Sequence, residues 1–208
     1  MRIERIERSK HKQERVLVHL EGGDLLRITE SELLHFGLYV GLDIGPETVV
    51  QLHKYGARSE TRARAANMVS ARPLSKRELT RRLVQKGAAA DDADAAVDYL
   101  ERIGALDDAS YAAMLVRHYS AQGFGAARLR GELYRRGVPS ELWDAALAEA
   151  PEVQETLARV IASKTKGKPL NEKDTKRLAD ALLRRGFSWS EVRSALRSAG
   201  AGLEDGDG

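Results

Sequence analysis

Leucines spaced four residues apart precede a glycine at three places along the chain. Aligned on that glycine, the segments read KRELTRRLVQKG ending at Gly87, AARLRGELYRRG ending at Gly137 and TKRLADALLRRG ending at Gly186, at spacings of 50 and 49 residues. Residues at i and i+4 share one helical face, so the pattern predicts three repeated amphipathic helices. Their buried leucines are Leu79 and Leu83, Leu129 and Leu133, and Leu178 and Leu182.

Each of these helices is expected to end at its glycine, which adopts the left-handed conformation that stops a helix. A cation immediately before the glycine faces the negative end of the helix dipole in all three copies. Ser75–Glu78 reads as a capping box that opens the first copy. A further helix is predicted after each glycine, beginning at Ser140 in the second copy and at the capping box Ser188–Glu191 in the third.

A third helix precedes each pair, at about 58–70, 109–121 and 152–165. Asp107 or Asp108 can cap the middle one, and Pro151 fits the first turn of the last. One three-helix repeat cannot bury its own apolar faces, so the repeats must stack. We therefore predict an all-α fold, in which tandem three-helix repeats at 57–104, 105–150 and 151–200 form an elongated curved array.

Residues 1–56 follow a different pattern and form an N-terminal extension. The apolar runs Arg15–Leu20 and Leu25–Ile28 flank Glu21–Asp24, which predicts a β-hairpin. Thr29–Glu32 then caps a short helix that runs through Phe36. Residues 201–208 are small and acidic, and we expect a disordered tail there.

The composition excludes several kinds of chemistry. There is no cysteine, so disulfides, thiolate metal sites and thiol nucleophiles are absent, and a reducing cytoplasm is the expected setting. The five histidines never fall at ligand spacing, and no apolar run approaches the roughly 18 residues of a membrane span. The acids Asp107 and Asp108 have no partner placed to complete a catalytic site, and Gly123–Gly125 lacks the pattern of a phosphate loop. We predict no enzyme activity, cofactor, metal or membrane association.

Charge alternates along the repeats and supplies the main functional clue. The net charge is +7 over residues 57–87, −6 over 88–116, +4 over 117–137, −5 over 138–156 and +6 over 157–187. Stacking in register would turn this alternation into a basic stripe, which attracts polyanions in a salt-dependent way. Its predicted cations are Arg72, Lys76, Arg77, Arg81, Arg82, Arg128, Arg130, Arg135, Arg136, Lys176, Arg177, Arg184 and Arg185.

Two simpler interpretations stand beside the basic stripe. Charged helices often carry charge because their outer faces are solvated, and cations at helix ends often interact only with the dipole. Most aromatic residues occupy helical positions beside leucine or alanine, which favours core packing over base stacking. Phe124, between two glycines, is the exception, and we predict either a contact residue or a staple for the next helix.

Four segments in order resemble the RecX family of recombination modulators. Arg72–Leu79 (RPLSKREL) is similar to the Arg-Pro-x-Ser-x-x-Glu-Leu opening of that family, and Leu106–Ala112 (LDDASYA) to its Leu-Asp-Asp segment. Gly125–Leu133 resembles the motif of its second repeat and Gly186–Ser188 that of its third. The resemblance runs from about residue 63 to 199, although Leu74 stands where the family commonly has a basic residue.

The resemblance implies a cytoplasmic bacterial protein with no catalytic residues. It implies binding to the RecA recombinase in the groove of its filament on DNA, with roles in DNA repair, homologous recombination and the SOS response. Such proteins typically restrain ATP hydrolysis, strand exchange and filament growth. We expect a monomer that inhibits RecA and contacts single- and double-stranded DNA through phosphates, with Phe124 and the cations of the stripe as binding residues. The alternatives are a general DNA-binding helical-repeat protein and a helical scaffold for an acidic protein.

Overall fold

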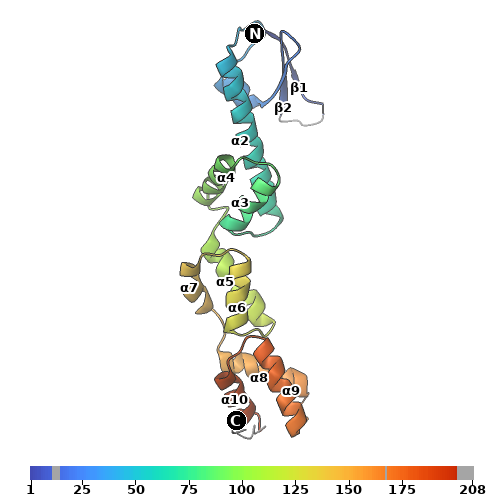
Figure 1. The fold of residues 1–208 in the computed structure, drawn as a ribbon, viewed down its shortest axis with the longest axis vertical. Helices are drawn as coiled ribbons and strands as arrows, with labels where there is room; N and C mark the ends of the chain where they lie inside the picture. The colour runs from blue at the N-terminus through green and yellow to red at the C-terminus, as the bar shows by residue number, and fades with distance from the viewer. Residues whose placement is uncertain (11–14, 167, 201–208) are drawn as a thin grey trace. The chain divides into compact units, whose positions relative to one another are not determined.

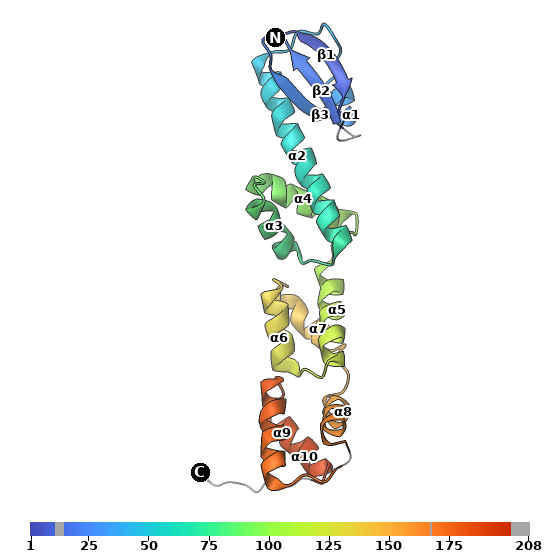
Figure 2. The ribbon, with the colours of Figure 1, turned by 90° about the vertical axis from the view of Figure 1, so that its right-hand side faces the viewer.

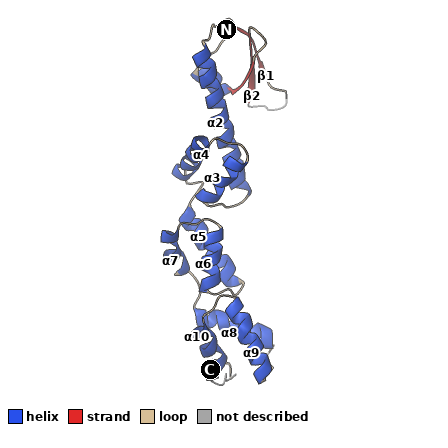
Figure 3. Ribbon diagram, in the orientation of Figure 1, coloured by secondary structure: helices blue, strands red, loops and turns tan. Residues whose placement is uncertain are grey.

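Helices account for most of the fold, and a small sheet precedes them (Figures 1 and 3). The structure is a computed structural model and describes residues 1–10, 15–166 and 168–200; the predicted tail at 201–208 lies outside these residues. The described chain divides into two units. The first comprises Met1–Arg72 with Leu79–Ala105, and the second comprises Pro73–Glu78 with the described residues from Leu106 onward.

The N-terminal sheet has three antiparallel strands in sequence order, as Figure 2 shows. The predicted hairpin is confirmed as β2 (Arg15–Leu20) and β3 (Leu25–Thr29). A third strand, β1 (Ile3–Arg8), pairs with β2 and was not predicted. Its sequence, IERIER, lacks the alternation that predicts a strand, because its two apolar residues are three positions apart. The strand is stabilised by pairing with β2 and by burial of Ile3 in the core.

One face of this sheet carries the core of the N-terminal region. Val16, Val18 and Leu20 alternate with partly exposed residues along β2 and are buried, because successive side chains of a strand point to opposite faces. Helix α1 (Glu30–His35) begins with the predicted capping box, in which Thr29 Oγ1 accepts from the Glu32 amide at 3.2 Å. The Glu32 carboxylate accepts from the Thr29 amide at 2.7 Å.

Helix α2 (Pro46–Ala71) begins twelve residues earlier than the predicted start at 58. Its first part packs on the sheet through Leu52, and its later part packs against α4. Only Leu52, Thr61 and Ala65 are buried along its 26 residues, so the apolar spacing that reveals the other helices is missing here. The predicted boundary between residues 56 and 57 therefore falls inside a helix.

Within the described residues, the later helices form the three predicted triplets, which we call the first, second and third modules. Their bounds are α2, α3 (Lys76–Gln85) and α4 (Ala90–Arg102); α5 (Asp108–Ala121), α6 (Ala126–Arg135) and α7 (Trp143–Leu147); and α8 (Val153–Thr165), α9 (Glu172–Arg184) and α10 (Trp189–Ser198). Two of the predicted helix starts were wrong. Ser140 begins a short 3-10 turn, Ser140–Leu142, ahead of α7, and Pro151 lies before the N-cap of α8 at Glu152.

The end of the second helix is the same in all three modules. Gly87, Gly137 and Gly186 have φ angles of +89°, +71° and +89°. The amide of the residue after each glycine donates to the carbonyl of the buried leucine that lies four positions before the glycine, at 3.1, 3.0 and 3.4 Å respectively. This is the Schellman motif, and it confirms the predicted helix ends.

Asp107 is the residue that caps α5. Its carboxylate accepts from the Ala109 amide at 2.9 Å and from the Ser110 amide at 3.1 Å. Hydrogen bonds from the Ser110 hydroxyl and these amides lower the pKa of Asp107. The neighbouring Asp108 is buried, and its carboxylate accepts from the Lys76 amide at 2.9 Å.

We expect Asp107→Ala to lower the free energy of unfolding by about 1 kcal/mol at neutral pH, because two amides of α5 lose their acceptor. A lowered folded-state pKa means that the ionised cap stabilises above the unfolded-state pKa, and that this contribution is lost as pH falls through the folded-state pKa. Urea unfolding at pH 7 and pH 3 should show the difference shrinking at pH 3. Asp180→Ala removes a carboxylate at an exposed position within α9 and is the control; it should change the free energy of unfolding at pH 7 by no more than about 0.5 kcal/mol.

Candidate functional site

The main chains of the second and third modules contact each other directly. The Gly125 amide donates to the Arg185 carbonyl at 2.9 Å, and the Ala127 amide donates to the Gly186 carbonyl at 3.1 Å. A Cβ atom on Gly125 would lie 2.5 Å from the Gly186 oxygen. The C-terminal end of α9 therefore meets the N-terminal end of α6, and the two helices follow one another in Figure 2.

A related contact joins α6 to the first turn of α3. The Ser75 hydroxyl donates to the Arg136 carbonyl and also accepts from the Glu78 amide at 3.1 Å, which is half of the predicted capping box. A Cβ atom on Gly137 would lie 3.2 Å from the Arg77 Cβ, closer than ordinary contact. Gly137, which ends α6, thus packs against the start of α3, and Gly186, which ends α9, packs against the start of α6.

Two of the predicted cations form hydrogen bonds next to these joints. Arg185 donates through Nη1 to the Gln122 carbonyl at 2.8 Å and to the Gly123 carbonyl at 3.1 Å. Arg136 donates to the Tyr119 hydroxyl at 3.4 Å, and this hydrogen bond raises the pKa of the guanidinium. Both guanidinium groups therefore have intramolecular acceptors.

Phe124 packs within the second module instead of projecting from its loop. Its ring is half-buried against the core of that module and lies 6.0 Å from the Tyr119 ring. The guanidinium carbons of Arg128 and Arg185 lie 5.6 and 5.5 Å from its centroid, within cation–π range. Of the two predicted roles, these contacts favour the staple.

The other candidate cations differ in how they are engaged. Arg128 and Arg135 both pair with Glu132, whose carboxylate is buried, while Arg130 approaches Asp144 and Arg177 approaches Asp174 at 3.9 Å. Arg72, Lys76 and Arg82 are half-buried and take part in polar or electrostatic contacts. Arg77, Arg81, Lys176 and Arg184 are exposed, and we take them as the side chains offered to a partner.

Opposite charges of the banded sequence meet inside the second module. Arg130 on α6 lies 3.9 Å from Asp144 on α7, and Arg117 on α5 pairs with Glu149 at 2.6 Å. Exposed pairs of this kind stabilise weakly, by about 0–1 kcal/mol, but they reduce the charge offered to a partner. The end-to-end arrangement of α6 and α9 still places their exposed cations on consecutive helices.

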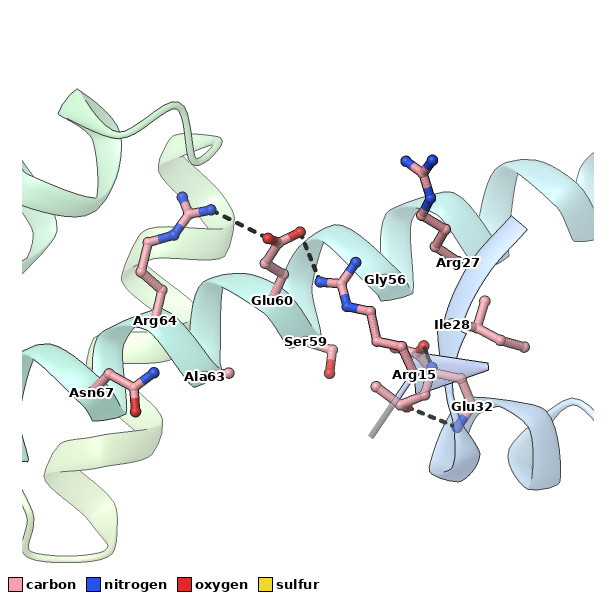
Figure 4. A pocket seen from close by; sticks show the side chains of 11 residues that line it. Arg15, Arg27, Ile28, Glu32, Gly56, Ser59, Glu60, Ala63, Arg64 and Asn67 are labelled. Atoms are coloured by element: carbon pink, nitrogen blue, oxygen red, sulfur yellow. Dashed lines mark hydrogen bonds and ion pairs between the residues drawn. The ribbon is translucent and has the colours of Figure 1, made fainter. Parts of the chain in front are cut away.

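A groove in the N-terminal region was not predicted from the sequence. It has a volume of about 600 Å³ and lies between β3 and the middle of α2 (Figure 4). Glu60 pairs with Arg15 at 3.1 Å and with Arg64 at 3.4 Å along its wall. Two of its arginines are thus bound to a carboxylate, which makes the groove a poor match for a polyanion.

The described residues also narrow the chemistry of the site. Within the ranges described, no three histidine or acidic side chains gather closely enough to bind a metal ion. Among the same residues, no helix has the length and apolar character needed to cross a bilayer. We take the exposed cations of the second helices as the candidate site.

These features define a protein of tandem three-helix domains, of which the second and third meet through their second helices. The models of the first and second three-helix domains of RecX match residues 62–100 and 107–147. A "Regulatory protein RecX" from Xanthomonas oryzae pv. oryzae is 36% identical over 136 residues, covering 64% of this chain and 85% of that protein. A protein of the same description from Lactobacillus delbrueckii subsp. bulgaricus is 28% identical, covering 91% and 72%.

Solved structures show the same fold. A crystal structure of regulatory protein RecX superposes with a TM-score of 0.73 at 20% identity, covering 95% of this chain and 98% of the other. The structure of RecX from Lactobacillus salivarius gives a TM-score of 0.60 at 18% identity, covering 68% and 96%. The identity to the Xanthomonas protein and the matches of the two RecX domain models show that the chain belongs to the RecX family.

Proposed function

We propose that this protein regulates the RecA recombinase by lying along its filament on DNA and restraining ATP hydrolysis, strand exchange and filament growth. Membership of a family of regulatory proteins supports a regulatory role. The observation that carries the binding mode is the end-to-end contact of α6 with α9, because it places the exposed cations of successive repeats on consecutive helices. A binding surface made of repeats suits a partner that is itself a repeating polymer.

Regulation by such a surface depends on a difference in affinity. A bound protein shifts an equilibrium between filament states only by the ratio of its affinities for them. Arginine and lysine side chains reach both phosphates and carboxylates, so the surface can contact DNA and an acidic protein face together. Preference for a filament state with slow ATP hydrolysis would make the protein an inhibitor.

Neutralising exposed cations should weaken filament binding and flatten its dependence on salt. We expect Arg81→Gln combined with Arg184→Gln to reduce the slope of log K against log salt by about one unit per lost phosphate contact. Filament binding measured by fluorescence anisotropy at several salt concentrations checks this result. Lys54→Gln with Arg197→Gln removes the same charge from exposed positions outside the candidate surface, and that variant should keep the original slope.

The proposed function is separated from its alternatives by comparing DNA with and without the recombinase. The protein should bind single-stranded DNA much more tightly when RecA and ATP have assembled a filament on it. Equal binding to bare DNA would instead identify a general DNA-binding protein. Binding to RecA that is indifferent to DNA and ATP would identify a scaffold for an acidic protein.

A further inference from the structure

A large apolar side chain is exposed at the same position of the second helix in every module. Val84, Tyr134 and Leu183 each lie three residues before the glycine that ends the helix. Their exposed fractions are 44%, 70% and 36%. The leucine immediately before each of them is fully buried. Since consecutive helical residues are separated by about 100°, the apolar residue points away from the core that the leucine enters.

The surroundings of these side chains favour contact with a partner. In the second and third modules the next residue is an exposed arginine, Arg135 or Arg184. On α6, Gly131 lies one turn before Tyr134 and is exposed, and a Cβ added there would meet nothing within 4 Å. A glycine inside a helix destabilises it, and here it leaves the backbone open beside an exposed ring.

The repetition is the strongest part of the observation. An isolated exposed apolar residue on a protein surface needs no explanation. Three at the same register, 50 and 49 residues apart, form a pattern that matches a partner with repeated binding sites. We call Val84, Tyr134 and Leu183 the apolar knobs.

We propose that each apolar knob inserts into an apolar recess with an acidic rim, one recess on each successive protein subunit of the filament. This inference rests on the proposed function and assigns protein contacts to the knobs. Valine and leucine side chains cannot hydrogen-bond to phosphate or stack on bases as an aromatic ring does, so an apolar protein recess suits all three knobs better than nucleic acid. The exposed Arg184 beside Leu183 favours carboxylates at the rim of the recess.

Alanine substitutions at the knobs test the inference. We expect Val84→Ala, Tyr134→Ala and Leu183→Ala each to weaken binding to the assembled RecA filament by about tenfold, because each loses apolar contact area. The losses should combine in the triple variant, and the slope of log K against log salt should stay unchanged, since no charge is removed. Thermal unfolding should match the parent protein, because the side chains are exposed. Ile103→Ala, which removes another exposed apolar side chain at 55% exposure outside this register, should bind like the parent.

Each other outcome overturns the inference. Parent-like binding by the three variants, or an equal loss with Ile103→Ala, would show that the knobs make no specific contact. A loss confined to Tyr134→Ala and also seen on bare single-stranded DNA would assign base stacking to the tyrosine instead. If the Arg81 and Arg184 substitutions weaken filament binding while the knob variants do not, the inference fails and the proposed function stands. If the parent protein does not bind the filament, both fail.

Discussion

Gly186→Ala is expected to separate the third module from the second and to destabilise the protein by about 3 kcal/mol or more. An alanine at φ +89° is strained, and its Cβ would lie 2.4 Å from the Arg128 nitrogen. That neighbour belongs to the backbone of α6, so it cannot move aside as a flexible side chain would. Urea unfolding followed by circular dichroism measures the loss, and limited proteolysis should cleave between α7 and α8 in the variant.

Substitutions at Gly87 and Gly125 distinguish the effect of backbone strain from the effect of the close contact. Gly87 has the same φ of +89°, but a Cβ added there would meet nothing within 4 Å, so Gly87→Ala should cost only the conformational strain, about 1–2 kcal/mol. Gly125 has an ordinary φ of −87°, so Gly125→Ala tests the close contact without strain. If Gly186→Ala is no worse than Gly87→Ala, the contact between α9 and α6 does not contribute to stability.

Leu182→Ala is expected to cost about 3 kcal/mol, because it leaves a cavity in the core of the third module. Leu182 is fully buried there among residues of α8, α9 and α10. The adjacent Leu183→Ala is the matched control and should change the free energy of unfolding by no more than about 0.5 kcal/mol. Both variants are compared by urea unfolding. A similar loss in the two would contradict the burial that separates these neighbouring leucines.

Comparison of Leu182→Ala with Leu183→Ala also distinguishes an effect on folding from an effect on binding. Leu182→Ala should lower stability, and any effect on filament binding should follow the fraction of folded protein. Leu183→Ala should leave stability intact and still weaken filament binding, because the side chain is an apolar knob. The same division applies in the first module to Leu83→Ala and Val84→Ala, where the buried and the exposed side chain are again adjacent.

The repeated modules could be predicted from the sequence because one strong pattern appears in each. A leucine pair and a terminal glycine define the second helix, and both act through local geometry that needs no knowledge of distant contacts. Helix α2 and strand β1 have no such pattern. The part of α2 before the predicted start at 58 buries only Leu52, and β1 depends on its partner strand, so both segments rest on tertiary contacts that local sequence does not encode.

The candidate surface was less predictable than the fold. Counting charges identified a basic band but did not distinguish exposed cations from Arg136 and Arg185, whose guanidinium groups bind nearby hydroxyl or carbonyl oxygens. The position of Phe124 between glycines left two roles open, a contact residue or a staple, and its packing against Tyr119 depends on the fold. The apolar knobs were visible in the aligned repeats three positions before the glycine, although only the structure shows that they are exposed.

The joint between the second and third modules includes two hydrogen bonds between main-chain groups, with consequences for how the protein can diverge. Hydrogen bonds between peptide groups set the angle between α6 and α9, so most surface substitutions leave that angle unchanged. Among the described residues between α8 and α9, 166 and 168–171, no main-chain hydrogen bond reaches the joint, so we expect changes of length there to leave the reach from Tyr134 to Leu183 unaltered. The side chains at positions 134 and 183 can therefore be substituted while the distance between these two positions stays the same.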